Sequence, residues 1–510
     1  MILFRTKASG KRSMHMSEIP NVEQDLTPVE SEPARKKFPF MIIPAILTLG
    51  AMVVLFLLTA YSSTLYYNVV QGLSSPGVGL GNYARLFLEY FEKALTNTLL
   101  VKVLMLAVCG AVSAGLCALY KSLKNPKHVL TAACLCLVPL VVPTIMQSLA
   151  VVEGIDHQSV IGLPLLFLLS EGLQTISLFC FTAGIFAYLH MQKTGEMGKS
   201  AWTGLLIAAA VWMLGNLTTN GVCPSLTNGF IGSLTFDRLI CGVMVSDIGL
   251  GGAVSTLKVL LQILIGILPI LFLRRHTPDH AMEQSSLRGE FWLLPAAGLG
   301  IALALFVPSI TVNLKDAPDF TVAGINSIIL TLAAGTIGVL IAWSLIRLLS
   351  RTSILLFAVI SLILAAALSC PLFEYLAFRR FLDALLPQAI LAVFDWRMVV
   401  VIITIGFLLR NHQVNRPVFL IIALGLLVAA FSWSDVYHAL IYGTHTGNHV
   451  LPYGYYAMLA NLNVYDQAGL PVSVLKQTYW YIALLIYIVP LLLGLGAALL
   501  TRKAFQEEAK

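Results

Sequence analysis

The chain has 510 residues, of which 58% are hydrophobic and only 11% are charged. This balance excludes a soluble protein of this length, which needs far more charge to cover its surface. The net charge of +7 indicates no nucleic-acid partner, because Lys and Arg gather at the ends of apolar runs, as the positive-inside rule predicts.

Residues 1–37 contain the polar, proline-containing stretch "VEQDLTPVESEPARKK", which predicts a disordered cytoplasmic tail. The tail is too long and mixed for the charged start of a signal peptide. The apolar run that follows it is long enough to stay in the membrane, so we expect no cleavable signal.

Apolar runs of roughly 20 residues, the length that crosses a bilayer as a helix, recur along nearly the whole chain. In hydrocarbon every backbone polar group must be bonded internally, so these runs predict an all-α, polytopic membrane bundle. The expected helices cover residues 38–62, 95–120, 129–151, 163–190, 201–216, 250–274, 291–312, 321–346, 353–375, 396–410, 417–436 and 478–500.

Charge predicts the topology. "ARKK" before the first helix places the N-terminus in the cytoplasm, and the connections expected on that side all carry Lys or Arg, among them "QKTGEMGK", "RLLSR" and "RNHQVNR". About twelve crossings return the C-terminus to the cytoplasm. We expect a multi-pass protein of a bacterial inner membrane, surrounded by lipid.

An internal repeat divides the chain. The helix that begins at Asn97, "NTLLVKVLMLAVCGAVSAGLCALYKSL", resembles the helix that begins at Asn326, "NSIILTLAAGTIGVLIAWSLIRLLS". Each is the second helix of its set, so we expect two parallel six-helix repeats about an axis along the membrane normal. The expected domains are residues 38–275 and 291–503, joined by a cytoplasmic linker at 276–290 and followed by a tail at 504–510.

The order of features in each repeat resembles the permease subunits of carbohydrate ABC importers of the maltose type. "GVGLGNYARLFL…FEKALTNTLL" and "MVSDIGLGGAVSTLKVLLQ", with Gly249, Ala253 and Ser255, are similar to the entry segment and the last helix of one subunit. "CPLFEYLAFRRFLDALLPQAILAVFDWRMVV" and "FSWSDVYHALIYGTHTGNHVLPYGYYAML" are similar to parts of the other subunit.

The resemblance implies two fused permeases of the type I importer fold that form a translocation pathway between them. It also implies a sugar-like substrate, a separate ABC ATPase and an extracytoplasmic substrate-binding protein as partners. The chain carries no ATP-binding P-loop pattern of its own, and we expect no cofactor.

The family's EAA loop, which docks into the ATPase, is missing or degenerate. Only "HMQKTGEMGKSAW" stands at its place in the first repeat, with Glu196 and Gly198 as remnants, and only "NHQVNR" in the second. Segments this short predict tight cytoplasmic turns without a transverse coupling helix. Arg410 and Arg416 are then expected in the headgroup region as topology anchors.

Candidate pathway residues follow from the resemblance. Trp433, Ser434 and Asp435 stand where the family has its Trp-Asn-Asp triplet, and Trp212 and Asn216 occupy the counterpart positions in the first repeat. The competing interpretation of the Trp residues is an interfacial anchor. Tyr453 is expected in an outside loop, either stacking on sugar or belonging to an interfacial belt.

Charged residues within the apolar runs are candidates of a different kind. Glu171 is either an intramembrane acid, and then functional by default, or an interfacial residue if its helix begins later. Lys102 and Lys258 lie near the start of their helices, where snorkelling to the interface accounts for both. Cys223 and Cys241 lie in or near an outside segment and could form a disulfide.

Three hypotheses remain open. The first is a permease for carbohydrate-type transport, and the second is a permease fold repurposed as a membrane scaffold or sensor without ATPase coupling. The third is a membrane enzyme such as a glycosyl transferase that uses Asp156, Asp247 or Asp316. We do not expect an enzyme, because no paired acidic motif, HExxH, CxxC pair or GxSxG appears, and we expect no metal site.

Overall fold

The structure is a computed structural model of the full chain. It describes residues 40–67, 71–120, 122–123, 125–144, 162–194, 198–215, 234–243, 247–276, 290, 293–306, 320–368, 389–436, 450–460 and 479–506. Residues Met1–Phe40 form a separate unit, and everything below concerns the unit Met41–Lys510. The predicted tail at 1–37 and most of the linker lie outside the described residues.

The described chain is mainly helical, and the bridge between Leu65 and Gly77 stands outside any named strand. Its principal helices are α1 (Ile43–Ser62), α2 (Gly81–Glu89), α3 (Phe91–Tyr120), α4 (Pro126–Leu135), α5 (Leu137–Leu140), α7 (Gly162–Thr194), α8 (Gly198–Gly215), α10 (Phe236–Val243), α11 (Ile248–Arg275), α12 (Leu293–Phe306), α13 (Phe320–Arg351), α14 (Ile354–Leu368), α17 (Trp396–Asn411), α18 (Pro417–Trp433), α20 (Leu451–Ala460) and α23 (Trp480–Phe505). Short 3-10 turns lie at Phe40–Ile42, Gly72–Ser74 and Ala392–Phe394 (η7).

The helices support a membrane protein. Within the described residues, 6 helices are long and apolar enough to cross a membrane, namely Phe40–Ser62, Phe91–Tyr120, Gly162–Met191, Ile248–Arg275, Phe320–Arg351 and Trp480–Phe505. Shorter apolar helices occupy Pro126–Leu140, Ser200–Leu214, Leu293–Ala304, Ile354–Ala365 and Pro417–Trp433. Each helix range expected from the sequence overlaps an observed helix, and the all-α bundle is confirmed, whereas the count of about twelve crossings stays a prediction.

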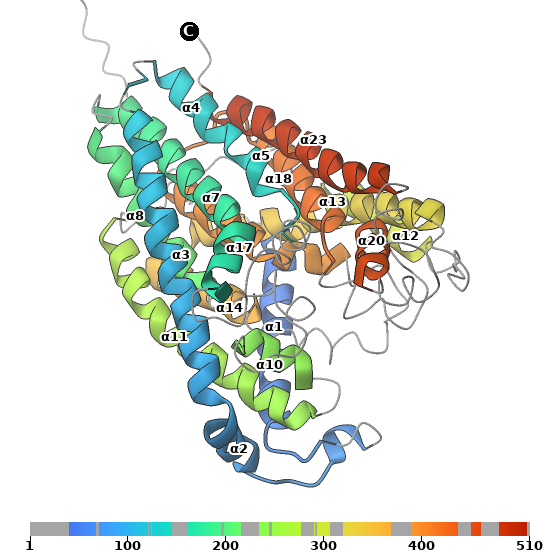
Figure 1. Cartoon of the computed structure of the whole chain (residues 1–510). Helices are drawn as coiled ribbons and strands as arrows, with labels where there is room; N and C mark the ends of the chain where they lie inside the picture. The colour runs from blue at the N-terminus through green and yellow to red at the C-terminus, as the bar shows by residue number, and fades with distance from the viewer. Residues whose placement is uncertain are drawn as a thin grey trace, which may run out of the picture. The chain divides into compact units, whose positions relative to one another are not determined.

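In the first half of the bundle, defined here as residues 41–276, α3, α7 and α8 pack on one another and α11 packs on α8 (Figure 1). Gly204 shows why α7 and α8 can approach closely. A Cβ atom there would lie 2.9 Å from Ala183 Cα, so only glycine fits without a shift of the backbone. Small residues have this role at membrane helix crossings.

In the second half, residues 290–506, α13 is the central helix and contacts α12, α17, α18 and α20, while α23 packs along α18. Gly335 and Gly425 mark the crossing of α13 and α18. A Cβ atom on either glycine would lie 3.2 Å from the carbonyl oxygen of the other. The two halves thus use the same kind of close crossing between their core helices.

The two halves also pack against each other. The last long helix of the second half, α23, packs on α4 and α5 of the first half, and the last long helix of the first half, α11, packs on α14 of the second. Helix α7 contacts α17 between them. Gly266 in α11 faces Leu362 of α14, and Gly494 in α23 faces Val141 after α5, at 2.5 and 2.6 Å from a Cβ atom built on each glycine.

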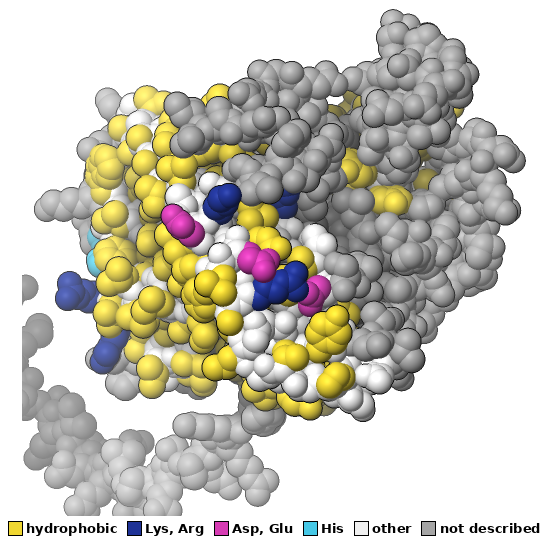
Figure 2. Space-filling model, turned by 60° about the horizontal axis from the view of Figure 1, so that its bottom comes forward, with side chains coloured by type: hydrophobic (Ala, Val, Ile, Leu, Met, Phe, Trp, Pro, Cys, Tyr) yellow, Lys and Arg dark blue, Asp and Glu magenta, His cyan; other side chains and the backbone are white. Residues whose placement is uncertain are grey.

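The outer surface is that of a lipid-facing bundle. Large apolar side chains stand exposed on the outer helices, including Leu57 of α1, Val103 of α3, Leu268 of α11 and Leu355 of α14. Figure 2 shows the face that carries α2, where a few acidic and basic side chains lie together within a mainly hydrophobic described surface. Hydrocarbon rather than water suits such a surface.

Three short helices correct the expected picture of loops between the spans. Helices α2, α10 and α20 each stand before or beside a long helix. Helix α2 is amphipathic, and its Asn82 donates to the Ser63 and Leu65 carbonyls at 2.9 Å each. Gly249 of α11 lies against the same group, since a Cβ there would lie 2.4 Å from Leu65 O. Asn82 and Gly249 are therefore joined in one packing contact.

Candidate functional site

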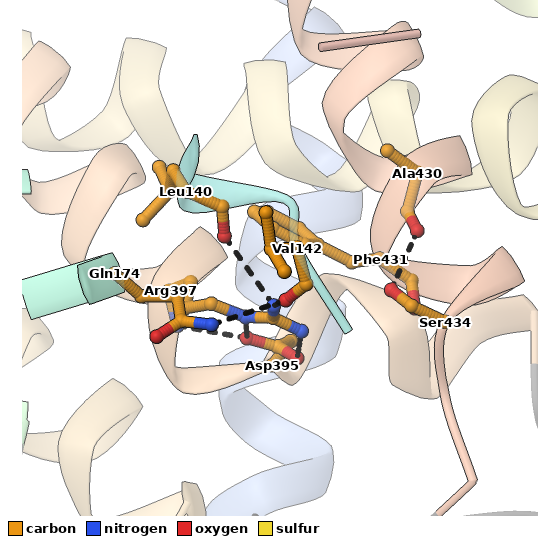
Figure 3. Close-up of polar contacts among 8 residues, drawn as sticks. All are labelled: Leu140, Val142, Gln174, Asp395, Arg397, Ala430, Phe431 and Ser434. Atoms are coloured by element: carbon orange, nitrogen blue, oxygen red, sulfur yellow. Dashed lines mark hydrogen bonds and ion pairs between the residues drawn. The ribbon is translucent and has the colours of Figure 1, made fainter. Parts of the chain in front are cut away.

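The candidate site lies where α17 begins, against α5 and α7 of the first half. Asp395 caps α17 by accepting a hydrogen bond from the Arg397 backbone N–H at 2.9 Å. Its two oxygens also accept hydrogen bonds from Arg397 Nε at 2.9 Å and Nη2 at 2.7 Å, so the two side chains form a bidentate pair (Figure 3). Such pairs are geometrically specific and stronger than neutral hydrogen bonds. The guanidinium is thereby aimed away from its own helix.

Arg397 uses its remaining donor to reach the other half. Its Nη1 donates to the carbonyls of Leu140 at 3.4 Å and Val142 at 3.2 Å, and its Cζ lies 4.4 Å from the centre of the Phe431 ring on α18. Gln174 of α7 donates to the same Val142 carbonyl at 3.2 Å. One backbone oxygen thus joins α7 and α17 (Figure 3).

A buried charge pair adjoins this contact in the first half. Glu171, one turn before Gln174 on α7, lies 3.9 Å from Lys102 Nζ on α3, and the two side chains are 2% and 6% exposed. Lys102 also stands over the Trp212 ring of α8, 5.7 Å from its centre. Phe179 meets the same indole edge-on at 6.1 Å. Glu171 is therefore buried well inside its helix, which favours the intramembrane alternative.

A second buried pair joins α10 to α11. Lys258 Nζ bonds directly to Asp237 Oδ1, and both side chains are almost fully buried. A pair held in a low-dielectric interior needs such close contact to offset its desolvation. The expectation that Lys102 and Lys258 snorkel to the interface is wrong, because each one reaches an acid on a neighbouring helix instead.

One hydrogen bond recurs in the two halves at matching positions. Thr98 Oγ1, which follows Asn97 on α3, accepts from the backbone N–H of Phe236, the first residue of α10, at 3.2 Å. Ser327 Oγ, which follows Asn326 on α13, accepts from the N–H of Leu451, the first residue of α20, at 2.7 Å. In both halves a hydroxyl satisfies the start of a short helix.

The tryptophans of the predicted pathway are buried. Trp212 contacts Lys102 and Phe179, both in the first half. Trp433 ends α18 and is 6% exposed. Neither indole N–H has a hydrogen-bond partner among the described residues. A buried donor without a partner is costly in a membrane interior. Asn216, the fourth residue of that prediction, lies outside the described residues.

The end of α18 accounts for part of the conformation of the residues that follow Trp433. Ser434 Oγ donates back to the Ala430 carbonyl at 2.8 Å, which places it at the C-terminus of α18 (Figure 3). Asp435 is half-buried just beyond. Tyr453 lies on α20 rather than in an exposed loop and is 9% exposed, so the loop prediction is wrong. Burial raises the pKa of Tyr453 above its ordinary value, and Tyr456 adds to this effect.

The two connections that stand in place of coupling loops are as short as predicted. Helix α7 ends at Thr194 and α8 begins at Gly198, while Glu196 lies outside the described residues. Helix α17 ends at Asn411 and α18 begins at Pro417, with no helix in the described residues between them. Neither connection has room for a transverse helix of several turns.

The second connection is covered by the end of α23. The Arg416 N–H donates to the Ala504 carbonyl at 3.2 Å, and Asn415 Nδ2 donates to the Gln506 carbonyl at 3.3 Å. Lys503 Nζ lies 5.7 Å from the centre of the Phe419 ring. These bonds place the 412–416 connection and the C-terminal end of α23 at one end of the bundle.

The two arginines of this connection differ. Arg416 is exposed, as a headgroup anchor would be, but Arg410 is fully buried and its guanidinium bonds to the Thr352 carbonyl after α13. The anchor prediction for Arg410 is therefore wrong. Tyr188 of α7 donates to the Phe505 carbonyl at 3.4 Å, so α7 joins the same end of the bundle.

Other candidates from the sequence have structural surroundings or lie outside the described residues. Asp247 caps α11 through the Leu250 N–H at 3.1 Å and pairs with Arg85 at 2.6 Å, so both its oxygens serve the fold. Asp156, Asp316 and Cys223 lie outside the described residues, as does the side chain of Cys241. Among the described residues no three His, Cys, Asp or Glu side chains gather as metal ligands would.

Sequence reasoning missed Asp395, Arg397 and Gln174 altogether. A signal was present, because "DWR" places an acid and a base at the start of an apolar helix, a position where a membrane protein carries charge only with a partner. No known protein family, curated protein or solved structure matches this chain.

Proposed function

We propose that this chain is a membrane permease in which two fused, related halves form a pathway for a polar solute, as in carbohydrate ABC importers. The halves would each contribute six crossings, giving about twelve in all. A sugar-like solute follows from the sequence resemblance. The proposal places the pathway at the contact of α7 and α17, where polar side chains of both halves meet.

The observation that carries the proposal is the matching pair of hydrogen bonds from α10 to Thr98 and from α20 to Ser327. Sequence alone already aligned Asn97–Thr98 with Asn326–Ser327. That each aligned hydroxyl holds the start of a short helix is not expected of two unrelated apolar helices. The reciprocal packing of α11 on α14 and of α23 on α5 supports the same relation between the halves.

The charges at the α7–α17 contact support transport more than a passive scaffold. Burying Arg397, Glu171 and Lys102 in a bilayer is expensive, and such residues usually mark a substrate or ion pathway. The unpartnered indole N–H groups of Trp212 and Trp433 add one donor in each half that a hydroxylated solute could use.

The test is uptake into sealed liposomes that contain the purified chain. A panel of radiolabelled mono- and disaccharides would be offered with and without a carbohydrate ABC ATPase and Mg-ATP. We expect saturable uptake of at least one sugar, reduced strongly by Arg397→Met and unaffected by Glu92→Gln, an exposed acid at the start of α3. Leakage that is equal for all sugars and all variants would contradict a permease.

A second function, a permease fold that now acts as a scaffold or sensor, is favoured by one observation. The connections at 195–197 and 412–416 are short, and the end of α23 bonds to the latter. An ATPase that grips transverse helices finds none in the described part of these connections. Uptake that is absent for every sugar, with no ATPase co-purifying in mild detergent, would favour this second function.

A further inference from the structure

One buried carboxylate is less well satisfied than the others. Asp237 bonds directly to Lys258, and Asp395 bonds Arg397 at 2.7 Å, whereas Glu171 lies 3.9 Å from Lys102. That distance is beyond hydrogen-bond range. The Oε1 atom of Glu171 accepts no hydrogen bond from any residue that the structure describes. The acid is therefore buried with charge compensation but incomplete hydrogen bonding.

Protonation removes the free-energy cost of burying a charged carboxylate in this position. A charged oxygen that is buried without a donor is much less stable than a neutral acid in the same place. Binding one proton forms an O–H bond on the carboxylate and removes the buried charge. Release of the same proton to water restores the carboxylate, so the cycle needs no other reactant.

We propose that Glu171 is a reversible proton-binding site within the membrane, and that its protonation loosens the contact between α7 and α17. The charged groups around it come from several helices: Lys102 from α3, Asp237 from α10, and Asp395 and Arg397 from α17, with Lys258 and Cys109 acting on Lys102. Of these groups, Lys102 and Arg397 favour the charged acid, while Asp237 and Asp395 oppose it.

The link to the interface runs through Arg397. Charged Glu171 attracts Arg397 across the α7–α17 contact, and Gln174 on the next turn of α7 shares the Val142 carbonyl with Arg397. When Glu171 becomes neutral, that attraction between the helices is lost and Asp395 alone compensates the arginine. Protonation thus weakens the contact that closes the proposed pathway.

The consequence for energy coupling rests on the proposed function, whereas proton binding does not. A permease that lacks a transverse coupling helix, as the described 412–416 connection does, needs another source of energy to move solute against a gradient. A proton that binds at the closed contact and leaves on the other side supplies that energy from the membrane potential and pH gradient. On the proposed function, the coupling ion is then a proton.

Proton binding is tested by infrared difference spectroscopy of the purified chain between about pH 5 and about pH 9. We expect a carboxylic-acid C=O band that disappears as pH rises, is absent in Glu171→Gln and persists in Glu92→Gln. Lys102→Met should shift the midpoint of this band to higher pH, because the cation that favours the charged acid is gone. The same band in Glu171→Gln, or no band in the wild type, would overturn proton binding.

Loosening of the contact needs a separate readout. Val142→Cys, in a background without the native cysteines, keeps the backbone carbonyl that both helices use and adds a reporter beside it. Because only the thiolate reacts, each alkylation rate by a small water-soluble maleimide is divided by the rate of a small free thiol at the same pH. We expect this ratio to be about tenfold higher at low pH than at high pH, about 1.4 kcal/mol in the opening equilibrium. In Glu171→Gln the ratio should be high at every pH.

The outcomes separate the claims. An alkylation rate ratio to the free thiol that is equal at all pH values, with the infrared band present, would reject the loosening and keep the proton site. Sugar uptake that is driven by an imposed pH gradient and lost in Glu171→Gln would support coupling. Sugar uptake that is indifferent to pH and to Glu171→Gln would leave the permease standing and overturn the coupling. No uptake with the infrared band present would reject the permease alone.

Discussion

The two halves of the bundle make several similar contacts but bury their charges at different places. Both have a hydroxyl that holds a short helix, a glycine crossing between core helices and a last helix that grips the other half. Among the described residues their buried ion pairs lie at different places, at Lys102–Glu171 and Lys258–Asp237 in the first half and at Arg347–Glu290 and Arg397–Asp395 in the second.

At the positions that match by counting, the second half has Thr331 for Lys102 and the buried Ile486 for Lys258. Thr331 lies as far after Asn326 as Lys102 lies after Asn97. Ile486 lies as far before the basic pair in the last turn of α23 as Lys258 lies before the basic pair in the last turn of α11. The difference teaches that packing and charge can change separately. The similar contacts use small and hydroxyl residues in comparable places, whereas the buried ion pairs occupy different places in the two halves.

The largest effect should come from breaking a first-half ion pair. Lys258→Met leaves Asp237 buried without its bonded cation, and we expect the free energy of unfolding to fall by about 3–5 kcal/mol. The matching change in the second half, Ile486→Met, should cost less than about 1.5 kcal/mol because it conserves volume and charge. Thermal unfolding in detergent, followed by size-exclusion chromatography, measures both.

The double variant Asp237→Asn with Lys258→Met is the control for this prediction. It removes both charges, so it should recover a large part of the stability that Lys258→Met alone loses. If Lys258→Met and Ile486→Met unfold at the same temperature, the buried pair is not what distinguishes the halves.

The glycine crossings should respond alike in the two halves. Gly204→Val and Gly425→Val each force a side chain against a neighbouring backbone, at an expected cost of about 1–3 kcal/mol. Gly110→Val is the matched control, because nothing lies within 4 Å of a Cβ there, and it should change stability by less than about 0.5 kcal/mol. If Gly204→Val or Gly425→Val left the stability unchanged, the helices at that crossing would be less closely packed than described.

The repeated hydroxyl contact predicts a smaller, equal effect. Thr98→Val and Ser327→Ala each remove the acceptor at the start of a short helix, and each should cost about 1 kcal/mol. Thermal unfolding of the two variants side by side gives the comparison. A loss in one half only would weaken the argument that the two contacts are equivalent.

The smallest effect should come from an exposed pair. Arg85 contacts Asp247 at 2.6 Å, but its side chain is 46% exposed, so water and salt screen the pair. Arg85→Ala should cost about 0.5 kcal/mol or less, and the difference should fade as salt is added. A cost as large as that of Lys258→Met would mean that burial is not the reason the first-half pairs matter.

Much of the framework follows from sequence because it depends on local pattern. Apolar runs fix where helices form, and the spacing of Asn97–Thr98 and Asn326–Ser327 marked two helices that make matching contacts. The lengths of the connections at 195–197 and 412–416 were equally readable. Helices α2, α10 and α20 were missed, since short amphipathic or aromatic segments look like loops between spans.

The site could not be predicted because its partners are far apart in sequence. The sequence around Lys102 and Lys258 does not indicate Glu171 or Asp237 as their partners. Snorkelling was therefore the explanation that the local sequence favoured. Arg410 ends α17 as an anchor would, yet its helix is buried among others and the side chain meets Thr352. Arg397 joins the halves through two backbone carbonyls, which carry no sequence signal at all.

The relation of the halves is tested most directly by two cross-links. Gly266→Cys with Leu362→Cys joins α11 to α14, and Gly494→Cys with Val141→Cys joins α23 to the end of α5. Each pair is placed in a background without native cysteines and with a specific protease site in the 276–290 linker. Gly110→Cys with Gly298→Cys is the control, because a Cβ at either glycine has no neighbour within 4 Å.

After oxidation in membranes and cleavage of the linker, we expect both pairs to hold the two halves in one band that separates on reduction. The control pair should give separate bands throughout. Cross-linking of one pair without the other, or of neither, would contradict two related halves that exchange their last helices.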